Sequence, residues 1–243
     1  EIGSGLVGSE MCIRDSTRSS LYLRIEEEGM DGEAWEKLWK EAKAAQRQKG
    51  YQQAYRSMEA AVKETEGEML FYQSKVCEGV FHRISSGATR DGLEVFGKME
   101  KGYLLSVDSN WDMYGDGYLS GHYFSEEALR EQLEKAYPGL VFTEEPLEKQ
   151  INMHKRDKVG HILSLTVGNK TISGEEFRQL LELPSSNFTM QAADRKIRFL
   201  CKGQGHGLGL SQYGGNVLAR EGKSYQEILR YYFPECEVKT KKS

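Results

Sequence analysis

The sequence predicts an α+β protein built from helices and hairpin-type strands. Segments with helical periodicity stand beside short segments of strand composition, and the two do not alternate in the regular order of a parallel α/β sheet. The length of 243 residues is sufficient to bury a substantial core. One domain over residues 17–238 is the simpler division, with residues 239–243 as a solvated tail.

The N-terminal part is predicted to be largely helical. Residues 17–28 and 33–49 have helical patterns, and helical periodicity resumes over residues 51–66 after a glycine. The period then changes. Residues 69–72 and 76–81 are predicted to pair as strands around a short turn.

The middle of the chain is predicted to be irregular and then helical. Residues 96–124 are rich in glycine and aromatic side chains. Such loops can line a sugar groove, or they can pack as ordinary surface loops. Ser125 has N-cap chemistry for a helix over residues 126–137, and Pro138 ends that helix.

The C-terminal part has both strand and helix signals. Residues 162–167 and 171–172 are predicted strands, and a capping box of Ser173 and Glu176 is predicted to open a helix that ends at Glu182. The remaining predicted elements are a basic strand over residues 195–202, a helix that includes residues 217–221, and a short helix opened by a capping box of Ser224 and Glu227.

A glycine-rich loop is the most informative feature of the chain. Residues 203–209 read Gly-Gln-Gly-His-Gly-Leu-Gly, which places the imidazole of His206 among residues with almost no side chains. Glycine has no Cβ and reaches positive φ, so backbone amides there can closely approach a bulky polar ligand. Ser211 and Gln212 then lead into a helical pattern. The alternative is a structural turn that lets a strand pass over a helix, with His206 as a satisfied polar residue.

Composition and motif spacing argue against several functional classes. The net charge is −4, so no global basic field favours nucleic acid as a partner. The glycine loop lacks the Gly-Lys-Ser/Thr of a phosphate loop and the acidic residue of a dinucleotide fingerprint. No run of about 18 apolar residues occurs, so no membrane-spanning helix is predicted.

Five blocks of the chain have recognisable motifs in a fixed order. They are residues 60–72 with Ala-Val-Lys-Glu-Thr, 81–89 with Ser-Ser-Gly-Ala-Thr, 103–108 with Tyr-Leu-Leu-Ser-Val, 173–188 with Phe-Arg and Leu-Pro-Ser-Ser-Asn-Phe, and 203–238 with Gly-His-Gly-Leu-Gly-Leu-Ser-Gln-Tyr-Gly. Together these blocks resemble the stage II sporulation protein D (SpoIID/LytB) family. The resemblance covers roughly residues 17–238 and implies a SpoIID-like domain.

The first residues of the chain stand apart from this resemblance. Residues 1–16 read as translated sequencing-adapter DNA, and such segments are excluded from fold reasoning. Glu10 imitates, by chance, the N-terminal motif that contains the proposed catalytic glutamate of the family. In the family that glutamate lies further ahead of the arginine that Arg18 matches. We therefore expect Glu10 to be spurious and the true glutamate to be missing.

The resemblance implies a peptidoglycan lytic transglycosylase, which cleaves the bond between N-acetylmuramic acid and N-acetylglucosamine in glycan strands. Such an enzyme uses one glutamate first as an acid and then as a base. We expect the chain as printed to be inactive because that glutamate is missing. The residues expected to support the site are Arg18 beside the glutamate and, as substrate contacts, Ser86, Thr89, His206, Ser211 and Gln212.

Two other interpretations stay open. One is a non-catalytic cell-wall-binding module that enhances a partner amidase, as the LytB branch of the family is associated with doing. The other is an unrelated sugar-binding domain with a chance Gly-His-Gly loop. Family members are exported or membrane-anchored by an N-terminal hydrophobic segment, which the adapter junction would have removed, so we expect an extracytoplasmic, wall-facing location.

No metal or cofactor is predicted. Some family members have a cluster of histidines and cysteines before the Ala-Val motif, but the corresponding residues 44–53 include neither type. Leaving out Cys12, which lies in the adapter-like segment, the cysteines are Cys77, Cys201 and Cys236. Their wide separation and odd number argue against a disulfide framework, and we expect each to be a small buried apolar residue.

Overall fold

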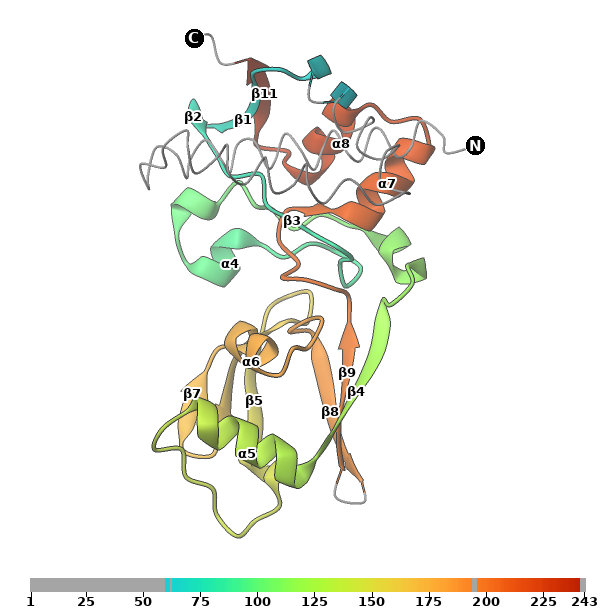
Figure 1. Cartoon of the computed structure of the whole chain (residues 1–243). Helices are drawn as coiled ribbons and strands as arrows, with labels where there is room; N and C mark the ends of the chain where they lie inside the picture. The colour runs from blue at the N-terminus through green and yellow to red at the C-terminus, as the bar shows by residue number, and fades with distance from the viewer. Residues whose placement is uncertain (1–59, 62, 194–195, 241–243) are drawn as a thin grey trace, which may run out of the picture. The chain divides into compact units, whose positions relative to one another are not determined.

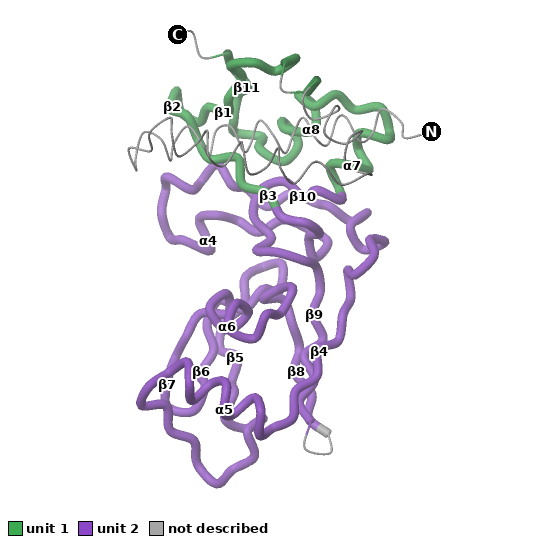
Figure 2. Tube along the Cα trace, in the orientation of Figure 1, with its two compact units in different colours: residues 1–81, 214–243 green, residues 82–213 purple. Residues whose placement is uncertain are grey.

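The computed structural model describes residues 60–61, 63–193 and 196–240 (Figure 1). Helices and several small sheets are both present, and the predicted α+β class is confirmed. The helices predicted before residue 60 and the adapter-like segment lie outside the described residues. The chain groups into two compact units (Figure 2), a first unit of residues 1–81 with 214–243 and a second unit of residues 82–213.

The first unit contains a three-stranded antiparallel sheet in the order β11-β1-β2. Its strands are β1 (Glu68–Tyr72), β2 (Lys75–Val76) and β11 (Glu237–Thr240). Gln73 and Ser74 join β1 to β2 with φ of 49° and 66°, the left-handed pair that a two-residue hairpin turn uses. The predicted hairpin turn is therefore confirmed, but the predicted second strand over residues 76–81 was wrong, because β2 ends at Val76 and residues 77–80 belong to no strand.

The first two residues of the predicted tail, residues 239–243, belong to a strand. Lys239 and Thr240 belong to β11 and pair with Met69 and Glu68 of β1. The polar composition of the last residues suggested a solvated tail, but backbone pairing to β1 orders these two. The prediction was wrong for Lys239 and Thr240, while residues 241–243 lie outside the described part of the chain.

Two helices near the C-terminus follow the glycine loop. They are α7 (Gln212–Arg220) and α8 (Tyr225–Tyr232). The side chain of Ser224 accepts the backbone N–H of Glu227, and the side chain of Glu227 accepts that of Ser224, so the predicted capping box is confirmed. The inner face of α8 buries Ile228, Leu229 and Tyr232 completely.

The second unit is built on two three-stranded antiparallel sheets, ordered β4-β9-β8 and β5-β6-β7. The six strands of these sheets are β4 (Leu119–Ser125), β5 (Ile151–Arg156), β6 (Ile162–Val167), β7 (Lys170–Ile172), β8 (Phe188–Ala193) and β9 (Lys196–Lys202). Two short strands, β3 (Phe81–His82) and β10 (Leu210–Ser211), lie outside these two sheets. The helices are α4 (Gly92–Phe96), α5 (Glu126–Ala136) and α6 (Gly174–Leu180), with 3-10 turns η1 (Met99–Lys101), η2 (Asn110–Tyr114) and η3 (Leu147–Gln150). Within the described ranges, no helix has the length and hydropathy of a membrane span.

An aromatic cluster lies at the centre of the second unit's core. Phe177 of α6 packs against Phe188 of β8 and Phe199 of β9, with ring centroids 5.6 and 5.7 Å away, and Phe188 and Phe199 are 5.3 Å apart. Leucines of α5 and residues of both sheets complete this core. Ser125 caps α5 as predicted. Ser173 caps α6 by accepting the backbone N–H of Glu176, but this helix ends at Leu180 and not at the predicted Glu182. The core therefore ties the two sheets and the two helices together.

The prediction of an irregular segment over residues 96–124 was wrong at its end. Residues 119–124 belong to β4, which pairs with β9 along its whole length. Side chains of β4 alternate between exposed and half-buried, so no apolar face marks the strand in the sequence. Pairing with β9, distant in sequence, stabilises it. Strands β5 and β8 were not predicted either.

Gly174 opens α6 where this helix approaches β6. A Cβ at this position would lie 2.1 Å from the carbonyl oxygen of Ile162. We expect Gly174→Ala to lower the free energy of unfolding by at least about 1–3 kcal/mol, because α6 would have to move away from the sheet. Urea denaturation followed by circular dichroism measures this loss.

Gly121→Ala in β4 is the matched control. A Cβ there would meet its nearest atom, Nε of Arg198, at an ordinary 3.4 Å. We expect a change within about 0.5 kcal/mol. Equal losses in the two variants would contradict the packing described for α6.

Candidate functional site

Two segments far apart in the sequence are joined by backbone hydrogen bonds in the second unit. We call them the serine turn (residues 84–90) and the glycine loop (residues 203–209). Ile84 and Gln204 form an antiparallel bridge, in which Gln204 N–H donates to Ile84 O at 2.7 Å. Further along, Arg90 N–H donates to Gly207 O at 2.7 Å. The blocks that contain Ser86 and His206 therefore form one structure.

The glycine loop uses the conformational freedom that its composition predicts. Gly203, Gly205, Gly207 and Gly209 have φ of 77°, 104°, 76° and 68°. A Cβ on Gly207 would lie 2.9 Å from Cδ of Arg90 and 2.9 Å from Nε2 of a histidine in the β5–β6 turn. The loop can approach these side chains because it has no Cβ at this point.

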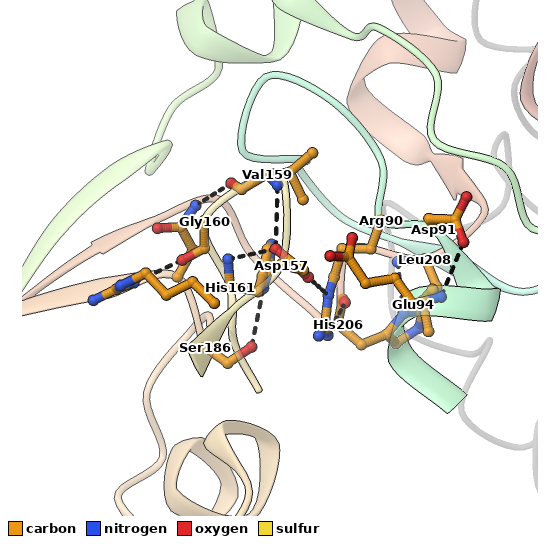
Figure 3. Close-up of polar contacts among 12 residues, drawn as sticks. Arg90, Asp91, Glu94, Asp157, Val159, Gly160, His161, Ser186, His206 and Leu208 are labelled. Atoms are coloured by element: carbon orange, nitrogen blue, oxygen red, sulfur yellow. Dashed lines mark hydrogen bonds and ion pairs between the residues drawn. The ribbon is translucent and has the colours of Figure 1, made fainter. Parts of the chain in front are cut away.

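A buried ion pair lies beneath the loop. Nε of Arg90 donates to Oδ2 of Asp157 at 2.5 Å, and their side chains are 4% and 1% exposed. Nη1 of Arg90 donates to the carbonyl oxygen of His206 at 3.1 Å (Figure 3). Arg90 therefore connects the serine turn, the turn between β5 and β6, and the glycine loop. Arg90 and Asp157 were not among the predicted site residues.

His161 connects two serines. Its Nδ1 is 2.9 Å from Oγ of Ser186, and its Nε2 is 3.3 Å from Oγ of Ser86. Its backbone N–H donates to Oδ1 of Asp157 at 2.8 Å (Figure 3). Burial, and next the charge of Arg90, hold the pKa of His161 well below its ordinary value. The imidazole is therefore neutral, and one of its nitrogens accepts a hydrogen bond.

A second pair of histidines lies at the glycine loop. The rings of His82 and His206 have centroids 5.8 Å apart. Nδ1 of His82 donates to Leu208 O at 3.0 Å, and burial lowers the pKa of His82 to about 3. The backbone N–H of Leu208 donates to Nδ1 of His206 at 3.1 Å. This bond places the proton of a neutral His206 ring on Nε2, where it is a donor.

Asp112 forms a second buried anchor, in η2. Its Oδ2 accepts the backbone N–H of Ser85 at 3.1 Å and the Ser85 hydroxyl at 2.5 Å, and its Oδ1 accepts the Ser211 hydroxyl at 2.9 Å. Burial raises the pKa of Asp112, and the hydrogen bonds from serines partly offset that rise. The carboxyl thus ties the serine turn to β10, which follows the glycine loop.

The predicted site residues have different environments. Ser86 and His206 are half-buried in the cluster. Thr89 and Ser211 are fully buried, and the Thr89 hydroxyl donates to Leu105 O at 3.2 Å and accepts Val107 N–H at 2.9 Å. Gln212 is half-buried at the start of α7. Arg18, and Glu10 which we expect to be spurious, lie outside the described part of the chain.

Five polar residues of the cluster were not predicted. They are His82, Arg90, Asp112, Asp157 and His161. The run Asp157–Lys158–Val159–Gly160–His161 does have a turn signature in its glycine, and Gly160 has φ of 95°. Within the described ranges, no three His, Cys, Asp or Glu side chains gather as metal ligands. The absence of a metal in the whole protein stays a prediction.

Comparison with known proteins identifies relatives of this chain. No family model matches the chain. Stage II sporulation protein D of Bacillus amyloliquefaciens is 30% identical over 189 residues, which cover 77% of this chain and 52% of the relative. The protein of the same name from Bacillus subtilis (strain 168) is 28% identical over the same shares. An amidase enhancer of Bacillus subtilis is 42% identical over 50 residues, 21% of this chain and 7% of the relative.

The chain belongs to the SpoIID-like family. The resemblance that the five ordered motifs indicate is thereby confirmed. The chain spans about half the length of the curated relatives that share the name stage II sporulation protein D.

In the SpoIID-like cluster, His82, His161 and two carboxyls lie in the interior, while Ser86 and His206 are half-buried. The imidazoles of His82 and His161 are neutral because of burial. Asp157 is held by Arg90, and Asp112 is enclosed by serines. Such an arrangement suits an uncharged polyhydroxylated ligand. Neither of these two carboxyls can protonate that ligand, because both are buried and already hydrogen-bonded.

The Arg90–Asp157 pair is expected to dominate the stability of this region. We expect Asp157→Asn to lower the free energy of unfolding by about 3–5 kcal/mol, because it leaves the Arg90 charge buried without its counterion. Thermal or urea unfolding of the purified chain measures the loss. The control is Glu145→Gln, which removes an exposed pair to Lys149 (60% and 65% exposed) and should cost at most about 1 kcal/mol. A small effect of Asp157→Asn would argue against the ion pair as an anchor.

Acid is expected to destabilise the second unit through its buried histidines. His82 has a pKa of 6.5 when exposed and about 3 when folded. Between these two values the unfolded chain binds the extra proton, so stability is complete above pH 6.5 and is lost as the pH falls. The expected slope is about 1.4 kcal/mol per pH unit for this residue.

The variant His82→Asn tests this pH dependence. An asparagine amide can still donate to the Leu208 carbonyl but does not titrate. Urea unfolding of both proteins at several values between about pH 4 and 7 should show a shallower slope for the variant. Asp112, whose raised pKa acts in the opposite direction, is present in both proteins and cancels in the difference. Parallel slopes would show that His82 is not held neutral in the folded state.

Proposed function

We propose that this SpoIID-like chain acts on the bacterial cell wall and that the serine turn and the glycine loop hold a glycan strand of peptidoglycan. The observation that carries this proposal is the junction of the two segments through Arg90 and their backbone bridges. Both segments belong to blocks that match the family motifs. Each presents a half-buried polar side chain, Ser86 and His206.

The chemistry of a glycan strand fits this surface. Its hydroxyl and acetamido groups are uncharged donors and acceptors. The Nε2–H of His206 can donate to a sugar oxygen, and the glycine loop lets a ring approach its backbone without steric conflict. Gln212, at the start of α7, is proposed as a further polar contact. Thr89 and Ser211 are proposed to hold the two segments in place from behind.

We propose that the reaction of the complete protein is lytic cleavage of the bond between N-acetylmuramic acid and N-acetylglucosamine. This cleavage needs a carboxylic acid near the glycosidic oxygen. Asp157 is unsuitable because it is buried and bound to Arg90, and Asp112 is unsuitable because it is fully buried. The acid is therefore proposed to come from outside the described residues, with Arg18 beside it. Since Glu10 lies in the adapter-like segment, we expect the printed chain to bind glycan without cleaving it.

A non-catalytic role is the second candidate. The 50-residue match to a protein named amidase enhancer favours it. In this case the same surface binds the wall, and a partner amidase performs the cleavage. Both candidates imply an extracytoplasmic, wall-facing location.

Binding and cleavage can be measured on peptide-stripped glycan strands. We expect the chain to cosediment with the strands and to release no 1,6-anhydromuramyl ends. His206→Ala should weaken binding about tenfold to a hundredfold, as expected for one lost hydrogen bond, with little change in melting temperature. The control His122→Ala, in β4, should bind normally.

The outcomes separate the interpretations. Unchanged glycan affinity in His206→Ala would show that the glycine loop is not the binding surface. Anhydro product that disappears in Glu10→Gln would show that Glu10 is the catalytic acid after all. A chain that stimulates an amidase on whole wall while producing no anhydro ends, even with a native N-terminus restored, would favour the enhancer role.

A further inference from the structure

Two cysteines of the first unit are in contact although they are distant in the sequence. Sγ of Cys77 and Sγ of Cys236 are 3.5 Å apart across a separation of 159 residues. Both side chains are buried, with 7% and 9% of each residue exposed. The sequence predicts that each cysteine is buried and isolated. Burial is confirmed for these two, but the prediction that they are isolated was wrong.

Backbone bonds of the sheet hold both cysteines in position. Cys77 follows β2, and its N–H donates to the carbonyl oxygen of Leu70 in β1 at 3.0 Å. Cys236 precedes β11, which pairs with β1 so that Val238 lies opposite Leu70. Leu70 of β1 therefore fixes the position of both segments, the one that contains Cys77 and the one that contains Cys236. The two thiols meet because of strand register, before any bond between them forms.

We propose that Cys77 and Cys236 form a disulfide that joins the two ends of the first unit when the protein meets a disulfide oxidant. The sulfur atoms must close from 3.5 Å to about 2.05 Å, a movement within reach of side-chain rotation. The proposal rests on this contact alone, so it holds whether or not the protein binds glycan. A compartment outside the cytoplasm would supply such an oxidant.

The reaction balances by thiol–disulfide exchange. One cysteine thiolate attacks a sulfur of the oxidant, a small-molecule or protein disulfide, and expels the first thiol of that oxidant. The second cysteine then attacks the mixed disulfide, forms the Cys77–Cys236 bond and expels the second thiol. Two electrons and two protons pass from the cysteines to the oxidant. Because β11 lies at the edge of its sheet, local opening of this strand gives the oxidant access.

The bond should form slowly at neutral pH and faster in mild alkali. The contact with Cys77 and burial both raise the pKa of the Cys236 thiol, so little of this thiol is ionised near neutral pH. Thiolate is the attacking form. Once formed, the bond closes a loop of 159 residues and restricts the unfolded chain, which should raise the melting temperature on the order of 10 °C.

The experiment uses the full chain with Cys12→Ser as background, because Cys12 lies outside the described residues. The protein is fully reduced, then incubated at about pH 8.5 with oxidised glutathione, and compared with the same protein kept in dithiothreitol. We expect a mass loss of about 2 Da, a peptide pair that joins Cys77 to Cys236, and the rise in melting temperature. Cys77→Ala and Cys236→Ala should abolish all three.

Cys201→Ala is the matched control, since Cys201 is fully buried in β9 of the second unit. This variant should still form the bond. A chain that remains reduced, a stable glutathione adduct, or a bond that involves Cys201 would overturn the proposal. If an alanine substitution prevents folding, the oxidised and reduced forms of the background protein still test the proposal, because only bond formation makes them differ in mass and in linked peptides.

Discussion

The Arg90–Asp157 ion pair is the interaction on which the candidate site depends. A guanidinium with its side chain 4% exposed is stable only with a counterion, and Asp157 supplies it from the turn between β5 and β6. The backbone N–H and Nη1 of Arg90 then fix the carbonyl oxygens of Gly207 and His206. The shape of the glycine loop is thus a consequence of a charge buried beneath it.

Asp112 is a second buried ionisable group, and it is stabilised in a different way. Its carboxyl is surrounded by hydroxyl and amide donors instead of a cation, and burial raises its pKa. Hydroxyl and amide donors supply no formal positive charge, so hydrogen bonds alone stabilise this buried carboxyl. Ser86 and His206 are half-buried in the two segments that these anchors hold, and the buried His161 is bonded to Ser86. The two anchors therefore hold the serine turn and the glycine loop together from the interior.

Local signals allowed part of this structure to be predicted. The caps at Ser125, Ser173 and Ser224 act within one turn of helix, and the loop glycines permit the positive φ values that the loop needs. Strand β4 was missed because its stability comes from β9, and its side chains show no buried face. Arg90 and Asp157 were missed because their pairing is long-range. The contact of Cys77 with Cys236 likewise follows from the register of β1 and β11.

This division between local and long-range information also bears on function. His206 could be singled out because glycines surround it in the sequence, and Ser86 through the family resemblance, whereas the charges that position them could not be predicted. A surface whose buried charges are paired is suited to holding a strand in place. Cleavage requires the opposite property, a carboxyl that is unpaired and can reach the glycosidic oxygen. In the proposed function, therefore, one added acid is the whole difference between a glycan-binding module and a lytic enzyme.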